Sequence, residues 1–304
     1  MTTERTRESR TGAARAGGEG TGRMATLKQA WAESKRDRLP LVAAGVAFYG
    51  FLAMIPTLIA AVLVYGLVSD PEDVTGQIEE YATALPDSAQ QLLTEQLSSV
   101  AEGQPQTLSI SLVIALAVAL WSASTGVANL ITAVNIAYNA EESRGFIAKR
   151  AIALLFTLGA IVFMLVALAL VAVLPVVANA LDLPGWATIV LEIGRWVILL
   201  FAVLAALGVL YRWAPTRETS GFRLFSFGAV LATILWVVIS VGFSIYVNNF
   251  GNYGETYGSL AGVVVLLLWM WLSAFAALFG AEVNAASERA AEPTRPAEPA
   301  RPAE

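Results

Sequence analysis

The chain has 304 residues, of which 57% are apolar and only 14% are charged, and its mean hydropathy is +0.64. A soluble domain has roughly 45–50% apolar and about 25% charged residues, so this composition indicates an integral membrane protein. The chain has no cysteine and no histidine, which excludes disulfides, thiolate and imidazole metal ligands, and Cys or His catalysis. We therefore expect a protein that is not an enzyme and that uses neither a cofactor nor a metal.

Six apolar runs are each long enough to cross a ~30 Å hydrocarbon core as a helix. They predict an all-α, polytopic membrane domain over residues 24–289, and no other segment is long enough for a separate soluble domain. The predicted spans are at about 40–68, 107–138, 148–178, 188–211, 222–248 and 258–282.

Both ends of the chain are polar. Residues 1–23 are rich in Gly, Thr, Arg and Glu, so we expect a disordered tail. The segment 24–39 combines Leu27 and Trp31 with basic residues, which predicts an amphipathic helix on the membrane surface, most simply an anchoring collar for the first span. Residues 290–304 repeat Pro with Ala, Glu and Arg and predict a second disordered tail.

The basic residues predict the orientation. Eighteen of the nineteen Lys and Arg residues lie in the terminal segments and in the connections 139–150 and 212–223, and Arg195 is the exception. The alternate loops contain none: 69–106, 179–187 and 249–257. The positive-inside rule therefore predicts a multi-pass protein of the cytoplasmic (inner) membrane with both termini in the cytoplasm.

Loop 69–106 is the one sizeable external segment, with eight acidic residues and no basic residue. Apolar residues recur at helical spacing on both sides of Pro86, which predicts two short amphipathic helices capping the outer face. The acidity either attracts cations or reflects only the exclusion of basic residues from the translocated side, which is the plainer account.

The first span has Pro56 near its middle, where a proline removes one backbone donor and predicts a kink. Gly45, Tyr49 and Leu52 fall on the same helical face. This face either packs closely against a neighbouring span or forms a hinge or cavity wall. Pro56 is the candidate hinge.

The second half of the second span is polar. A polar stripe runs along it at helical spacing, made of Ser122, Thr125, Asn129 and Thr132. An unsatisfied polar group in hydrocarbon costs several kcal/mol, so the stripe should face protein or water rather than lipid. It either lines a pathway or supplies hydrogen bonds that hold neighbouring helices together, and the sequence favours neither.

Between the fifth and sixth spans lies YVNNFGNYGETYGSLAG. Its glycines and tyrosines suit a tight turn at the level of the lipid headgroups, or else a re-entrant gating element. In the second interpretation Asn249, Asn252 and Tyr257 form an outer gate. Gly258 and Gly262 add a GxxxG pair, a weak signal that leaves a homo-oligomer open.

Charged residues also lie near the ends of two predicted spans. Glu192 and Arg195 are three residues apart and are expected to pair on one helix face. Glu282 ends the sixth predicted span and is expected to lie at the membrane interface.

These segments resemble the YihY/virulence factor BrkB family of bacterial inner-membrane proteins. The matching stretches include AAGVAFYGFLAMIP at 43–56, WSASTGVANLITAVNIAYN at 121–139, YRWAP at 211–215 and most of 246–286. The resemblance covers residues 30–289 and implies a six-helix membrane domain with both termini in the cytoplasm. Members have been linked to resistance to serum killing and proposed as transporters. The family implies no agreed substrate and no catalytic residues.

Some members carry the label ribonuclease BN, which this sequence disfavours. A metal-dependent nuclease would need His or Cys ligands, and basic residues spread over the cytoplasmic flanks form no groove for nucleic acid. No nucleotide-binding loop is present in the sequence. We therefore expect a transporter of an ion, lipid or small solute that is not driven by ATP and whose partner is the lipid bilayer. The alternative is a structural or assembly protein of the envelope without transport activity.

Overall fold

The computed structural model describes residues 22–66, 105–174, 178, 184–216, 225–249 and 259–291. Within these ranges the chain is helical apart from short connections, and six helices are long and apolar enough to cross a membrane. The predicted all-α polytopic class is therefore confirmed. The long elements are α2 (Leu39–Gly66), α5 (Pro105–Ala137), α6 (Phe146–Leu168) with its π-helical continuation η1 (Ala169–Val173), α8 (Gly185–Trp213), α9 (Phe227–Asn249) and α11 (Ser259–Ala291).

The predicted surface helix at 24–39 is present as a helix over residues 22–36. It ends in a turn where Arg38 has a φ of 52°, in the left-handed region. α2 then begins with Pro40 in its first turn, where a proline fits because its missing N–H would have no partner in the helix. The turn at Asp37 and Arg38 therefore separates the surface helix from the first span.

α11 extends beyond its expected end. The prediction placed that end at 282, whereas the helix continues to Ala291. Polar residues replace apolar ones after 282, but none is a proline or glycine, so the backbone has no reason to leave the helix. The loss of hydropathy marks the end of the membrane pattern and not the end of the helix.

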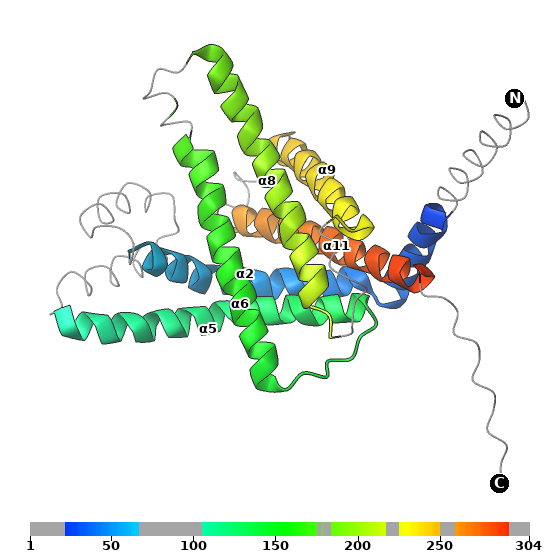
Figure 1. Cartoon of the computed structure of the whole chain (residues 1–304), viewed down its shortest axis with the longest axis horizontal. Coiled ribbons are helices and arrows are strands. Elements are labelled where there is room, and N and C mark those ends of the chain that lie inside the picture. Colours follow the sequence, from blue (N-terminus) through cyan, green and yellow to red (C-terminus); the bar gives the residue numbers. More distant parts are fainter. Residues whose placement is uncertain are drawn as a thin grey trace, which may run out of the picture.

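The helices run in two main directions in Figure 1: α2, α5 and α11 run roughly alongside one another, and α6 and α8 cross them. α2, α5 and α11 lie side by side, and α9 packs against α11 and α8. α6 contacts α5 and crosses it steeply in Figure 1, and α8 contacts α9. The connection after α5 returns along that helix before α6 begins. As a result, the start of α6 lies near the polar half of α5.

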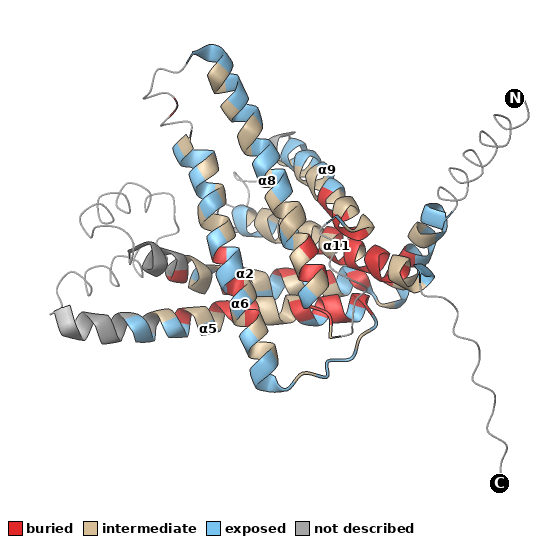
Figure 2. Cartoon of the chain, viewed as in Figure 1, coloured by how far each residue is buried: buried red, intermediate tan, exposed pale blue. Residues whose placement is uncertain are grey.

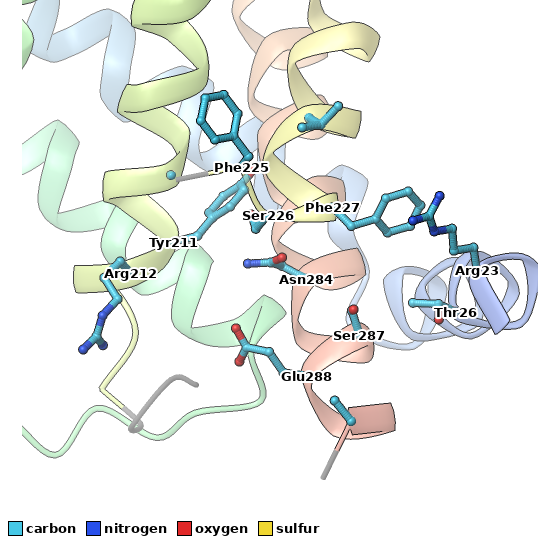
Figure 3. Close-up of a pocket in the computed structure, with 13 residues that line it drawn as sticks. Arg23, Thr26, Tyr211, Arg212, Phe225, Ser226, Phe227, Asn284, Ser287 and Glu288 are labelled. Atoms are coloured by element: carbon cyan, nitrogen blue, oxygen red, sulfur yellow. The ribbon is translucent and has the colours of Figure 1, made fainter. Parts of the chain in front are cut away.

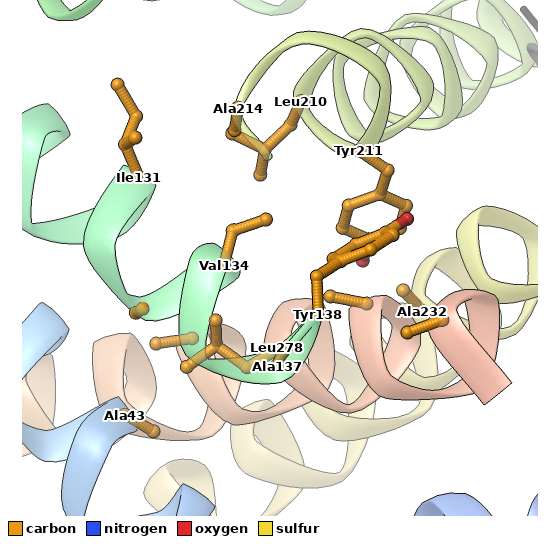
Figure 4. Close-up of a cluster of buried hydrophobic side chains, with 14 of the residues drawn as sticks. Ala43, Ile131, Val134, Ala137, Tyr138, Leu210, Tyr211, Ala214, Ala232 and Leu278 are labelled. Atoms are coloured by element: carbon orange, nitrogen blue, oxygen red, sulfur yellow. The ribbon is translucent and has the colours of Figure 1, made fainter. Parts of the chain in front are cut away.

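Buried residues gather where the end of α5, the end of α8, the start of α9 and the second half of α11 meet (Figure 2). Ile131, Tyr138, Tyr211 and Leu278 belong to the largest buried cluster (Figure 4). Elsewhere on α6 and α8 most apolar side chains are exposed, as expected for surfaces in contact with lipid.

Glycines set the closest helix crossings. A Cβ on Gly280 would lie 2.7 Å from the Tyr211 hydroxyl and would also clash with Gly228 and Ala232 of α9. A Cβ on Gly126 of α5 would lie 2.7 Å from the Cβ of Ala53 in α2. Close backbone approach through small residues is the usual source of packing energy between membrane helices.

The expected packing face of the first span is not the one used. A Cβ on Gly45 would meet nothing within 4 Å, and Tyr49 and Leu52 are exposed. α2 instead approaches α5 through Gly50 and Ala53. The close-packing interpretation of the Gly45 face is therefore wrong.

α2 remains helical through Pro56. The role of Pro56 as a hinge stays a prediction. A Cβ added to Gly262 of the GxxxG pair would also meet nothing within 4 Å. The predicted tails, 1–23 and 290–304, are described only at residues 22–23 and 290–291, which are helical and not disordered as expected. The rest of both tails, the cap helices of loop 69–106 and the turn at 250–258 lie outside the described residues.

Candidate functional site

The polar stripe of α5 faces the start of α6. Thr125 and Thr132 are exposed, and Ser122 and Asn129 are half-buried. The amide of Asn129 donates to the Thr125 carbonyl at 2.9 Å, and the Thr132 hydroxyl donates to the Ala128 carbonyl at 2.9 Å. These donors are satisfied within their own helix, which leaves the hydroxyl oxygens able to accept hydrogen bonds from outside it.

Two cations near the start of α6 use these acceptors. Lys149 Nζ donates to Thr132 Oγ1 at 3.0 Å, and Arg150 Nη1 donates to Thr125 Oγ1 at 3.4 Å. Arg150 also donates to the backbone carbonyl of Trp121, and its guanidinium carbon lies 3.8 Å from the centre of the Trp121 ring. Two positive charges of α6 therefore lie against the stripe.

Lys149 and Arg150 differ in whether a nearby carboxylate neutralises their charge. Lys149 lies 3.7 Å from Glu142, which also pairs with Arg144 at 2.9 Å. Arg150 forms no ion pair with a carboxylate in the part of the chain that the structure describes, and its Nε is buried there without a hydrogen-bond partner. Arg150 as a whole is half-buried, and a positive charge without a carboxylate partner favours the approach of an anion.

Glu142 anchors the connection between α5 and α6. Asn135 donates to its carboxylate at 3.2 Å, and the Asn135 carbonyl oxygen accepts from the backbone N–H of Thr216 at 2.9 Å. Arg144 donates to the Ala214 carbonyl at 2.6 Å. This network ties the connection to the ends of both α5 and α8.

The surroundings of Glu142 favour its charged form. Burial by itself would raise the pKa of this carboxyl, but the hydrogen bonds and charge of Arg144, together with the charge of Lys149, outweigh that effect. The pKa of Glu142 therefore lies below its ordinary value. The network holds best when Glu142 is ionised.

A cavity of about 460 Å³ opens at the same end of the bundle, between residues 22–36, α8, α9 and α11 (Figure 3). Its polar lining comes from Arg23, Thr26, Arg212, Ser226, Asn284, Ser287 and Glu288. Asn284 Nδ2 donates to the Tyr138 hydroxyl at 2.9 Å, and Asn284 Oδ1 accepts from the Gly228 N–H at 3.4 Å. Asn284 thus links three helices beside the cavity.

The predicted pair of Glu192 and Arg195 is confirmed as an ion pair. The side chain of Glu282 is fully buried (0% exposed). Residues 22–36 and α11 pack together next to it, through Ala30, Val283 and Ala286. The expected position of Glu282 at the level of the membrane interface stays a prediction. Neither of its carboxyl oxygens has a hydrogen-bond partner among the described atoms.

The other candidate residues are placed only in part. Asn249 is the last residue of α9. Asn252 and Tyr257 lie outside the described residues, so the outer gate stays a prediction. Sequence reasoning did not select Lys149, Arg150 or Asn135 as site residues. The one available signal was the pair of basic residues directly before an apolar run.

In the described ranges, no group of acidic residues is arranged to hold a metal ion. The fold and this polar region define a polytopic all-α membrane protein with a positively charged stripe. The model of the virulence factor BrkB family matches residues 30–304, and the chain belongs to this family.

Curated relatives agree with this assignment. The chain is 34% identical over 276 residues to a ribonuclease-like protein, YfkH, of Bacillus subtilis, covering 86% of this chain and 94% of the relative. A UPF0761 membrane protein of Alteromonas mediterranea is 41% identical over 91 residues, which are 30% of this chain and 31% of the relative. One of Vibrio parahaemolyticus is 37% identical over 92 residues, or 30% and 29%. No solved structure matches the chain.

Proposed function

We propose that the protein is a transporter of the cytoplasmic membrane that is not driven by ATP and that carries an anion. The sequence leaves an ion, a lipid or a small solute open, and the charge of the polar stripe favours the anionic members of each class. The single observation that supports this proposal most strongly is the position of Arg150 on the stripe without a paired carboxylate in the described chain.

The chemistry of the stripe suits an anion in transit. A positive charge attracts anions and repels cations, and the half-buried position of Arg150 makes this effect stronger than it would be in bulk water. Hydroxyl and amide side chains add neutral hydrogen-bonding groups next to it, so a solute that loses water finds replacement partners. Because Thr125 and Thr132 are exposed, their hydroxyls are accessible to such a solute.

A second function fits the same bonds. Lys149 and Arg150 also join α6 to α5, which is the role that a structural or assembly protein would need. In that case the cations stabilise the helix pair and move nothing. The two functions predict different effects of removing the charge of Arg150.

The test uses purified protein reconstituted into liposomes. Efflux of chloride, nitrate and inorganic phosphate is measured, and transfer of a fluorescent phosphatidylglycerol between leaflets is measured separately, so that a soluble anion and a lipid headgroup are distinguished. Arg150→Gln removes the charge on the stripe. Arg195→Gln is the matched control, because it removes an arginine of α8 that is paired with Glu192 instead.

We expect Arg150→Gln to lower transport of the accepted anion by about tenfold or more, the loss that corresponds to about 1.4 kcal/mol. Arg195→Gln should keep the wild-type rate. Thermal unfolding of each variant in detergent monitors folding. The proposal fails if no probe moves through the wild-type protein, or if Arg150→Gln lowers only the unfolding temperature and leaves the rate unchanged.

A further inference from the structure

Glu282 is a fully buried carboxyl group that the proposed transport function does not use. Its two oxygens, and Oδ2 of Asp37, are buried without a hydrogen-bond partner in the described structure. Asp37 is one of the charged neighbours that act on Glu282. Asp37 sits in the turn between the surface helix and α2, so the pair joins this turn to α11.

The charges around the pair do not neutralise it. Glu33 of the surface helix and Arg289 of α11 are the other charged groups that act on Glu282, and these two form an ion pair with each other. The helices α2, α5 and α9 contain no charged residue. Arg289 is therefore already paired with the carboxylate of Glu33. Among the described ion pairs, Glu282 and Asp37 have no cation.

A fully buried carboxylate next to a second carboxylate cannot stay ionised at low cost. Glu282 is stripped of water, and the half-buried Asp37 adds a like charge that repels it. One proton on Glu282 removes both costs, because the neutral carboxyl carries no charge.

We propose that Glu282 is a proton-binding site, in which a proton taken from bulk water is held on its buried carboxyl beside Asp37. Removing the proton returns it to water and leaves two negative charges facing each other. The site does not depend on the nature of the transported solute.

The contacts on both sides of Glu282 couple this proton to the position of the surface helix. Ala30 is buried against Val283 and Ala286 of α11. Trp31 packs edge-on against Phe279, with 6.0 Å between the ring centres. The surface helix therefore docks on α11 around the two carboxyls. When the proton is lost, repulsion between the two carboxylates weakens the contacts that Ala30 and Trp31 make with α11.

Infrared spectroscopy of the protein in lipid nanodiscs detects the proton directly. At neutral pH, above the ordinary pKa of about 4 for a carboxyl, we expect a C=O stretching band of a protonated carboxylic acid. Glu282→Gln should remove the band, and Glu141→Gln, which removes an exposed carboxyl in the connection after α5, should retain it. Absence of the band from the wild-type protein would overturn the proposal even if the variants failed to fold.

Cysteine labelling tests the coupling, because the chain has no cysteine of its own. Ala30→Cys places a thiol in the buried contact, and Ala32→Cys places one on the exposed side of the same helix. The ratio of the two labelling rates cancels the effect of pH on the thiol. We expect this ratio to rise with pH by up to about tenfold per pH unit, the limit for one proton released.

Glu282→Gln should make the ratio independent of pH, because an amide takes up no proton. A ratio that stays flat in the wild-type protein would contradict the coupling. A ratio that responds to the identity of added sodium, potassium or calcium rather than to pH would overturn the proton site in favour of a cation site. Anion efflux is measured separately, so failure of the transport proposal leaves these results interpretable.

Discussion

The guanidinium group of Arg150 lies over the ring of Trp121, 3.8 Å from its centre, and donates to the Trp121 backbone carbonyl. The contact joins the start of α6 to the middle of α5. It also keeps the arginine on the polar stripe, next to Thr125. The position of this one charge is thus set by an aromatic ring on another span.

Replacing Trp121 with Leu should loosen Arg150. The change removes the cation–π contact, which contributes about 0.5–2 kcal/mol depending on exposure, and we expect a comparable loss in the free energy of unfolding. Trp121→Phe retains an aromatic face and should lose less. Chemical denaturation in detergent measures both variants, and equal stability of Trp121→Leu and the wild type would show that the ring contact contributes nothing.

Asn129→Ala removes the amide at the centre of the stripe, which bonds only to its own helix among the described contacts. We expect a loss of anion efflux with folding retained, because the amide is a candidate partner for the solute and not a contact between helices. Efflux and thermal unfolding are measured on the same preparation. An unchanged rate would remove Asn129 from the mechanism.

The lowered pKa of Glu142 predicts that the free energy of unfolding falls in acid. Because its pKa is lowered in the folded protein, its contribution is fully present above the ordinary pKa of a glutamate, about 4, and is lost as the pH falls through the lower folded value. We expect about 1 kcal/mol or less after solvent screening. Glu142→Gln should match the acidified wild type.

The measurement is the difference in unfolding temperature between wild type and Glu142→Gln at several pH values. It should be largest near neutrality and should shrink in acid. Glu141→Gln is the control, because the side chain of Glu141 is exposed next to the network. A difference that grows in acid would contradict the assigned role of Glu142.

Gly280→Ala should be the most damaging of the small substitutions. The new methyl group would meet the Tyr211 hydroxyl and Ala232 where α9 and α11 cross, and overpacking of this kind costs about 1–3 kcal/mol or more. Gly262→Ala on the same helix is the matched control, because its Cβ would have open space. Thermal unfolding should separate the two variants clearly, and equal stability would show that the crossing relaxes without cost.

Part of the architecture was accessible from the sequence. The six spans follow from runs of apolar residues, because the thickness of the membrane converts local hydrophobicity into helix length. The end of α11 was misplaced because polar residues interrupt the apolar pattern after Glu282 while the chain remains helical. The packing face of α2 was misassigned because the choice between two faces depends on the partner helix, here Gly126 of α5.

The site was only half predictable. The polar stripe is visible as a period of three to four residues within one helix. Its contacts with Lys149 and Arg150 depend on how steeply α6 crosses α5, which no local pattern encodes. The burial of Glu282 likewise depends on where the surface helix docks. Long-range packing, not composition, decides which polar residues meet.

The most direct test of the central claim is the accessibility of the stripe to water. Single cysteines are placed at 122, 125, 129 and 132, with Ile131→Cys as the buried control and Val118→Cys as the exposed apolar control on the same helix. Each variant is labelled with a membrane-impermeant maleimide in intact cells and in inside-out vesicles. The pathway account predicts that the stripe is labelled and both controls are protected. Protection of all six positions in both preparations would contradict it and would identify the stripe as a contact between helices.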